Sequence, residues 1–211
     1  MSTLVDKIVQ TMRADIFSGN LRAGQPLKQV ELANRYGVSP IPLREALQRL
    51  QVEGLVEYFA YRGAIVARTR KAEATDIVDI RKALELLAFE HALPHLVQSQ
   101  LVELERLTEA LDSPRSRSDA NYFMESNLAY FETLLARSNR PILLEMIQMN
   151  LKRATRYYAE LLRQRPDEAD LKPSRRDYLA AIHRRDLPAL RVMIESRHTA
   201  FLSALESVLE D

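Results

Sequence analysis

The sequence of 211 residues contains no cysteine. This absence excludes disulfide bonds, thiolate metal sites and thiol catalysis. The chain also lacks any apolar run that approaches the roughly 20 residues of a membrane-spanning helix. Its first residues, MSTLVDKIVQTMRADIF, carry charges where the apolar core of a signal peptide would lie. We therefore expect a cytoplasmic protein that has no membrane partner.

Glycine is scarce, and all five glycines lie before residue 64. The rest of the chain is rich in Leu and Ala, with apolar residues at spacings of three and four, which is typical of packed helices. The first seventy residues instead alternate short helical stretches with turns. We place the boundary in the polar stretch RTRKAEA (68–74) and predict two domains, 1–70 and 71–211.

Acidic residues are few in the first of these domains. Residues 1–70 hold ten Lys and Arg against six Asp and Glu, a net charge of +4, whereas residues 71–211 hold twenty against twenty-three, a net charge of −3. The positive excess favours an anionic partner for the N-terminal domain. An ordinary solvated surface would give the same balance, so the charge alone decides nothing.

The N-terminal domain is predicted to contain three helices and a β-hairpin. Apolar residues recur every four positions over 4–16, which indicates an amphipathic helix. A second helix in 27–37 stops at Gly37, and a third follows in 38–54. The stretch LVEYFAYRGAIVAR (55–68) predicts two strands joined by a turn. This order is that of a winged helix-turn-helix, but a small α+β domain with no role in nucleic-acid binding would show it too.

The turn before the third helix has the residues that a helix-turn-helix needs. Gly37 can form a left-handed cap, and Ser39 can cap the next helix. The third helix should bury one stripe, formed by Leu43, Ala46, Leu47 and Leu50. Arg44 and Gln48 lie off this stripe, and Arg44 falls in the first turns, where a recognition helix meets base edges and an arginine can pair with guanine. The alternative is an exposed arginine near Glu45.

The stretch SPIPLREALQRLQVEGLV (39–56), with the segments on either side of it, resembles the DNA-binding domain of GntR-type transcription regulators over residues 4–68. The usual family pattern is Ser-Arg-Thr-Pro-Val-Arg-Glu-Ala-Leu, then Arg-Leu, then Glu-Gly-Leu. The resemblance implies that Arg44 contacts bases or adjacent phosphates and that the wing tip enters or borders the minor groove. The predicted DNA contacts are Ser39, Ile41, Arg44, Gln48, Arg62 and Gly63. Alternatively, Gly63 is only a turn residue and Arg62 its solvated neighbour.

Two residues of the first turn, Pro40 and Ile41, separate this chain from the family pattern. Pro40 stands where the pattern has a base-contacting arginine, and Ile41 replaces a threonine. Proline is tolerated in the first turn of a helix, where the N–H groups have no intrahelical acceptor. Because Pro42 disfavours helical geometry at Ile41, we prefer a helix that begins at Pro42 to one that is capped by Ser39 and begins at Pro40. In both cases one arginine contact is lost, and the operator should differ from the usual half-site at that position.

The second domain is predicted to be an all-α bundle of about six helices, so the whole chain is mainly α. The predicted helices are 74–95, 100–111, 121–138, 141–163, 174–184 and 187–209. Four polar side chains interrupt their apolar faces, namely Arg81, Asn127, Arg175 and Arg197. Each one alone could reach solvent or pair with a carboxylate such as Glu85 or Glu195. Together they favour a shared polar cavity, because burying them dry and unpaired would be costly.

Three stretches of the second domain form a further pattern: DIVDIRKALELLAFEHA (76–92), NLAYFETLLARSNRPIL (127–143) and RRDYLAAIHRRDLPALRVMIESRH (175–198). They resemble the FCD domain, the effector-binding domain of one GntR subgroup. In many such domains an Asp and three His hold a divalent metal that presents itself to an organic acid. The corresponding residues here are Asn127, Phe131, Arg175 and Arg197. None keeps its ligand type, so we expect no required cofactor, although a shifted alignment would restore His198 and a metal-dependent regulator stays the alternative.

Arginines are predicted to replace the metal as the positive centre of this cavity. The predicted effector contacts are Arg81, Asn127, Tyr130, Arg153, Arg175, Tyr178 and Arg197. Guanidinium groups bind carboxylates through two parallel hydrogen bonds. We therefore expect a small organic acid, bound through its carboxylate or phosphate, as the effector.

The sequence as a whole predicts a transcription regulator that binds an inverted-repeat operator in double-stranded DNA as a homodimer. Two-fold symmetry on a palindrome doubles the base contacts that one small domain can make. The habit of the family favours repression over activation. An enzyme built on the helical bundle is the rival from another class, but the sequence has no G-x-S-x-G, phosphate loop or His-Glu-x-x-His. We therefore expect no enzymatic activity.

Overall fold

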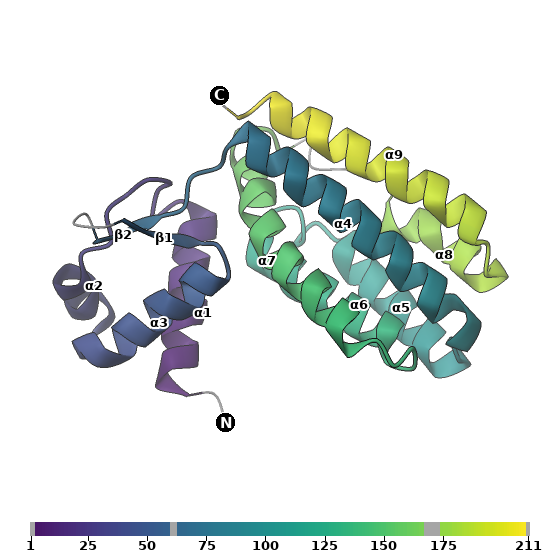
Figure 1. The fold of residues 1–211 in the computed structure, drawn as a ribbon, viewed down its shortest axis with the longest axis horizontal. Coiled ribbons are helices and arrows are strands. Elements are labelled where there is room, and N and C mark those ends of the chain that lie inside the picture. Colours follow the sequence, from purple (N-terminus) through teal and green to yellow (C-terminus); the bar gives the residue numbers. More distant parts are fainter. Residues whose placement is uncertain (1–2, 60–62, 167–173, 210–211) are drawn as a thin grey trace. The chain divides into compact units, whose positions relative to one another are not determined.

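A computed structural model describes residues 3–59, 63–166 and 174–209. The chain divides into two compact units, Met1–Thr69 and Arg70–Asp211, which Figure 1 shows in colours that follow the sequence. The first unit holds three helices and a hairpin, and the second is helical throughout its described part. The prediction of a mainly α fold with an N-terminal winged helix-turn-helix is confirmed.

The first unit is built around its third helix. Its elements are α1 (Leu4–Ser18), α2 (Gln29–Tyr36), α3 (Pro40–Val52), β1 (Val56–Phe59) and β2 (Gly63–Val66). Both α1 and α2 pack against α3, and the predicted stripe on α3 is completely buried. The strands pair antiparallel, with Val56 opposite Val66 and Phe59 opposite Gly63. Burial of one stripe leaves the other side of α3 facing solvent, and this exposed side carries Arg44.

An ion pair ties the start of this unit to the end of α3. Arg13 of α1 donates to both carboxylate oxygens of Glu53, with Nη2–Oε1 at 2.7 Å and Nε–Oε2 at 3.1 Å. The two side chains are only 9% and 11% exposed. A two-pronged contact of this kind fixes orientation as well as distance, so it helps to hold α1 across α3.

The third helix begins at Pro40, with Ser39 at its N-cap, so the prediction of a start at Pro42 is wrong. Both prolines fit because they occupy the first turn, whose N–H groups have no intrahelical acceptor. The Ser39 side chain makes no capping hydrogen bond. A cap usually finds its donor two or three residues on, and Pro42, at the second of these positions, has no N–H.

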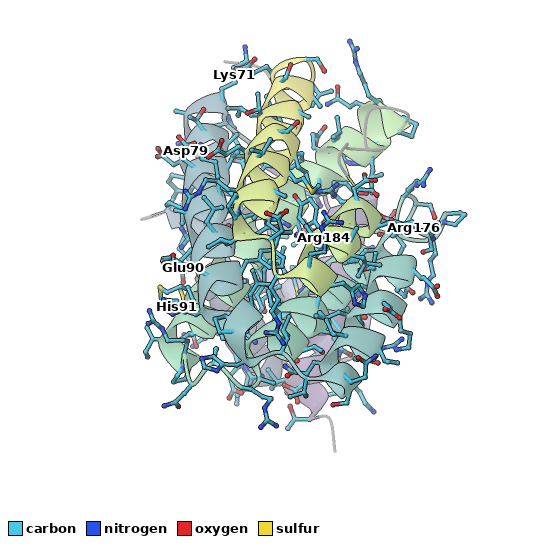
Figure 2. The ribbon with its side chains drawn as sticks, turned by 90° about the vertical axis from the view of Figure 1, so that its right-hand side faces the viewer. Lys71, Asp79, Glu90, His91, Arg176 and Arg184 are labelled. Atoms are coloured by element: carbon cyan, nitrogen blue, oxygen red, sulfur yellow. The ribbon has the colours of Figure 1, made fainter. Side chains whose placement is uncertain are left out.

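The second unit is a bundle of helices. Its elements are α4 (Lys71–Ala92), the short 3₁₀ helix η1 (Leu93–His95), α5 (Gln98–Leu111), α6 (Ala120–Leu135), α7 (Pro141–Gln164), α8 (Arg175–Arg184) and α9 (Leu187–Glu206). α4 packs against α6, α7 and α9, while α5 packs against α6 and α8. In Figure 1, α4 and α9 run side by side. Figure 2 shows the same pair from the side, with Lys71, Asp79 and Glu90 following one edge of α4.

Several predicted helix ends need correction. The first predicted helix (74–95) instead begins at Lys71 and ends at Ala92, since Pro94 disfavours α geometry before it and lacks a donor. α6 ends at Leu135, where 138 was predicted, and α9 ends at Glu206, where 209 was predicted. The remaining ends agree within two residues. Among the described residues, no helix combines the length and the apolar character needed to cross a membrane.

Candidate functional site

The exposed side of α3 carries most of the side chains predicted to contact DNA. Arg44 and Gln48 are exposed, and neither makes a hydrogen bond or ion pair with any described residue. Ile41 is 74% exposed. Ser39, with no capping bond, also keeps its hydroxyl free of described partners. The helix therefore presents these groups to a partner outside the chain.

The wing is the hairpin of β1 and β2, and its first strand packs against α3. Gly63 opens β2 in a left-handed conformation, with φ at 75°. An added Cβ there would meet nothing within 4 Å, so the backbone conformation, and not the available space, is what favours glycine. Arg62 lies outside the described residues, and its predicted contact stays a prediction. Burial raises the pKa of Tyr58 in β1, and the positive charge of the nearby Arg44 opposes this rise.

The polar centre of the helical unit is an ion pair between Glu85 of α4 and Arg175 of α8. The two side chains are 1% and 2% exposed. Arg175 donates through Nη1 to Oε1 and through Nη2 to Oε2, the latter at 3.4 Å. His198 of α9 lies against the same carboxylate, with Nε2 3.1 Å from Oε2. Three helices that are far apart in sequence thus converge on one glutamate.

Electrostatics keep this centre ionised. Burial alone would raise the pKa of Glu85, but the charge of Arg175 and the hydrogen bond with His198 outweigh it and hold the pKa well below its usual range. For Arg175, the pKa is raised, because nearby negative charge outweighs the effect of burial. Burial lowers the pKa of His198, although Glu85 opposes this shift. At neutral pH the centre therefore holds one carboxylate and one guanidinium.

Aromatic rings enclose the Arg175 guanidinium. Its central carbon lies 5.1 Å from the ring centre of Tyr130, 5.5 Å from that of Phe131 and 5.2 Å from that of Tyr178. Cations at such distances are attracted to ring faces. Tyr178 in turn donates its hydroxyl to the Met193 carbonyl at 3.3 Å. Arg175 therefore already has an internal carboxylate and a cage of rings.

A cavity that is partly open to solvent lies beside this centre. Its lining combines the basic side chains of Arg81, Arg197 and His198 with the rings of Phe123, Tyr158 and Phe201. The rings of Phe123 and Tyr158 stack, with their centres 3.9 Å apart. The lining thus offers both positive charge and aromatic surface, which are the features that an acid with an apolar body would need.

Arg81 is one of the cations that line this cavity. It is half-buried and makes no hydrogen bond or ion pair with the described residues. Burial, together with the positive charges of Arg175 and Arg197, lowers the pKa of Arg81 to about 10, which leaves it charged at neutral pH. It also borders a second, small and mostly apolar cavity beside Asn150. A half-buried guanidinium without a partner is suited to an anion.

Two other predicted effector contacts, Asn127 and Tyr130, have buried polar atoms without a hydrogen-bond partner among the described residues. Asn127 is 1% exposed and donates to the Phe123 carbonyl at 3.0 Å, but its Oδ1 has no partner among the described residues. The hydroxyl of Tyr130, which is fully buried, also lacks one there. By contrast, the inclusion of Arg153 is wrong, because it is exposed on the same side of α7 as the exposed Met149.

The donor set does not fit the divalent metal that the FCD resemblance implies. Arg175, at one of the family's ligand positions, is a guanidinium paired with Glu85. His198, the residue that a shifted alignment would restore, is held by the same carboxylate. Within the described ranges, no group of three or more His, Cys, Asp or Glu could hold a metal ion. Glu85 and His198 as a pair fall short of the ligands that a zinc site needs.

From the sequence, Glu85 is only one of the carboxylates that could neutralise an arginine. The aromatic lining residues Phe123, Tyr158 and Phe201 are not predicted from the sequence. Nothing in the local pattern around Glu85 separates it from a surface glutamate, since it lies four residues from Arg81 on an amphipathic helix. The aromatic residues likewise occupy apolar positions of amphipathic helices, where they look like ordinary core residues.

Comparisons with known proteins find matches to both units of the chain. The model of the gntR family of bacterial regulatory proteins matches residues 4–66, and that of the FCD domain matches residues 76–200. The HTH-type transcriptional regulator McbR of Escherichia coli (strain K12) is 30% identical over 146 residues, which are 69% of this chain and 66% of that protein. The gluconate operon transcriptional repressor of Bacillus licheniformis is 29% identical over 146 residues, 69% of this chain and 59% of that protein. The match thus spans three fifths to two thirds of these relatives.

Solved structures extend the similarity to nearly the whole chain. The structure of E. coli McbR/YncC has a TM-score of 0.77 at 26% identity and covers 98% of this chain and 99% of that one. Lar, titled as controlling the Listeria monocytogenes agr system, has a TM-score of 0.58 at 15% identity over 99% of both chains and shows the shared fold alone. These relatives are transcription regulators and not enzymes. The chain belongs to the GntR family of bacterial regulatory proteins and carries an FCD domain.

Proposed function

We propose that this protein is a DNA-binding repressor whose affinity for its operator changes when a small organic acid binds the helical unit. The observation that carries the DNA-binding half is the exposed side of α3, where Arg44 and Gln48 have no partner among the described residues. The stripe on the opposite side is buried, which leaves this face of the helix available to DNA. Arg44 reads a base edge, and Ser39 with the wing residues Arg62 and Gly63 contacts the backbone or the minor groove.

The operator should be an inverted repeat bound by a homodimer. A single winged helix makes few base contacts, and a two-fold pair makes each contact twice on a palindrome. Repression is supported by the similarity of this chain to the gluconate operon transcriptional repressor of Bacillus licheniformis. Selection of bound sequences from a random DNA pool tests both points. Enrichment of an inverted repeat supports the proposal, and enrichment of no sequence contradicts it.

The effector should be an acid with an apolar or aromatic body. Its carboxylate binds Arg81, with Arg197 in the lining of the same cavity, and its body lies against the rings of Phe123 and Tyr158. We assign Arg175 and Tyr178 to holding Glu85 and shaping the wall, because their polar groups already have partners. Asn127 and Tyr130 keep unsatisfied atoms that can bind a second polar group of the ligand or a water molecule.

Thermal unfolding in the presence of simple acids tests this assignment. Benzoate and hexanoate carry the same charge but different bodies, and either should raise the melting temperature of the wild type if it binds. Arg81→Ala should abolish this rise, while Arg153→Ala, which removes an exposed arginine of the same unit, should keep it. An equal rise in wild type and Arg81→Ala would contradict the role of Arg81.

A further inference from the structure

The DNA-reading helix displays a large apolar side chain in an unusual place. Ile41 is 74% exposed, more than any other large apolar residue in the described part of the chain. It is the second residue of α3, in the first turn of the helix. An isoleucine left in solvent gives up the favourable burial that such a side chain normally obtains.

Its surroundings hold this side chain in place. Pro40 and Pro42 flank it in the helix, and each fixes its own backbone φ. Isoleucine branches at Cβ and keeps one preferred rotamer in a helix. The two prolines have no N–H to offer, and Ile41 has no polar side-chain atom. The first turn of α3 therefore presents a rigid hydrocarbon surface, and its side-chain hydrogen bonding is limited to the hydroxyl of Ser39.

Base edges in the major groove offer one apolar feature that could match this surface. Guanine, adenine and cytosine present hydrogen-bond donors and acceptors there, whereas thymine adds a C5-methyl group. The first turn of a recognition helix is the part that meets base edges. We infer that Ile41 reads the methyl group of a thymine in the operator half-site. This inference rests on the proposed DNA-binding function and names a base that it recognises.

The substitution also changes the chemistry of recognition relative to the family pattern. At these two positions the pattern has an arginine, which suits guanine, and a threonine, whose hydroxyl can bond to several bases. Proline and isoleucine remove both hydrogen-bonding side chains. In the first turn, base specificity then comes from apolar contact. Hydrogen bonding to a base is left to Arg44, about one helical turn further on.

A matched control exists on the same helix. Val52, the last residue of α3, is another exposed aliphatic side chain, at 67%. It lies eleven residues after Ile41, about 16 Å along the helix axis, beyond the turns that meet base edges. Ile41→Ser and Val52→Ser each remove an exposed aliphatic group, so neither should alter the fold, and unchanged thermal unfolding of both variants verifies this.

The experiment uses a DNA duplex selected from a random pool by the wild-type chain. Each thymine of the selected site is replaced in turn by deoxyuridine, which removes only the methyl group. We expect one position in each half-site to weaken wild-type binding about fourfold, the value of one buried methyl group. Binding by Ile41→Ser should not change at that position, whereas binding by Val52→Ser should weaken as in the wild type.

Two outcomes would overturn the inference. If no uracil replacement weakens wild-type binding, or if Ile41→Ser stays as sensitive as the wild type, Ile41 does not read a methyl group. In both cases a selected site exists, so the proposed DNA binding stands. Failure to select any site would overturn the proposed function together with this inference.

Discussion

Replacing Glu85 by glutamine tests whether the buried ion pair organises the helical unit. The variant keeps the size of the side chain and loses its charge. Arg175 is 2% exposed and would keep its charge without the carboxylate that now balances it. Removing one partner of a buried pair typically costs about 3–5 kcal/mol, because the other charge stays buried. The three aromatic rings around Arg175 remain and offset part of this cost, so we expect a loss near the lower end, about 3 kcal/mol.

The assay is urea unfolding at pH 7, followed by circular dichroism. Glu195→Gln is the matched control, since it makes the same chemical change on an exposed glutamate of α9, where substitutions usually stay within about 0.5 kcal/mol. A double variant, Glu85→Gln with Arg175→Met, removes both charges and should recover much of the lost stability. If Glu85→Gln unfolds at the same urea concentration as Glu195→Gln, the ion pair does not hold the unit together.

The effect of Glu85→Gln should also depend on pH in a defined direction. The pKa of Glu85 is held below its usual 4.5 in the folded state. A carboxyl group whose pKa is depressed by folding contributes stability above its unfolded pKa and loses it as the pH falls through the folded pKa. The difference between wild type and variant should therefore be full at pH 7 and shrink below about pH 4.5. A difference that grows as the pH falls would refute this account.

Three further predictions concern other contacts. Arg44→Ala should weaken binding to the selected operator by about 1–3 kcal/mol and relax the preference at one base pair, measured by competition between operator variants; a uniform loss across all sequences would assign it to phosphate. Arg13→Ala should lower the unfolding free energy by about 1.5–3 kcal/mol, because it removes the charge-assisted hydrogen bonds to the half-buried Glu53, and an unchanged urea midpoint would contradict this. His198 has its pKa lowered from 6.5 by burial, so the unfolded chain takes up its proton first and stability should fall as the pH drops below 6.5; His198→Gln should flatten this slope, and an identical slope would assign it to other groups.

Local periodicity was sufficient to predict the scaffold of α3. Leu43 and Leu47 recur on one face, and the structure buries both completely. The predicted start at Pro42 rested on the rule that a residue before proline avoids helical geometry. Because N–H groups in the first turn of a helix have no intrahelical acceptor, both prolines fit there and the helix begins at Pro40.

The sequence predicts the cavity arginines of the candidate site but not the partners of its buried glutamate. Arg81 and Arg197 interrupt apolar faces, so their place on a cavity wall could be expected from spacing. The pairing of Glu85 with Arg175 and His198 arises from the convergence of three helices and has no local signal. The prediction for Arg153 rested on its spacing of four residues from Met149. Met149 is itself exposed on α7, so this spacing does not place Arg153 in the interior.

The most direct test of the proposed function is the affinity of the protein for its selected DNA, measured by fluorescence anisotropy against a scrambled duplex of the same composition. We expect binding to the selected site to be at least about 1,000-fold tighter, to weaken as salt is raised, and to change when an acid that stabilises the wild type is added. Equal affinity for the selected and scrambled duplexes would contradict the account of α3 as a reading helix. Specific binding that no stabilising acid alters would contradict the account of the cavity as the control site.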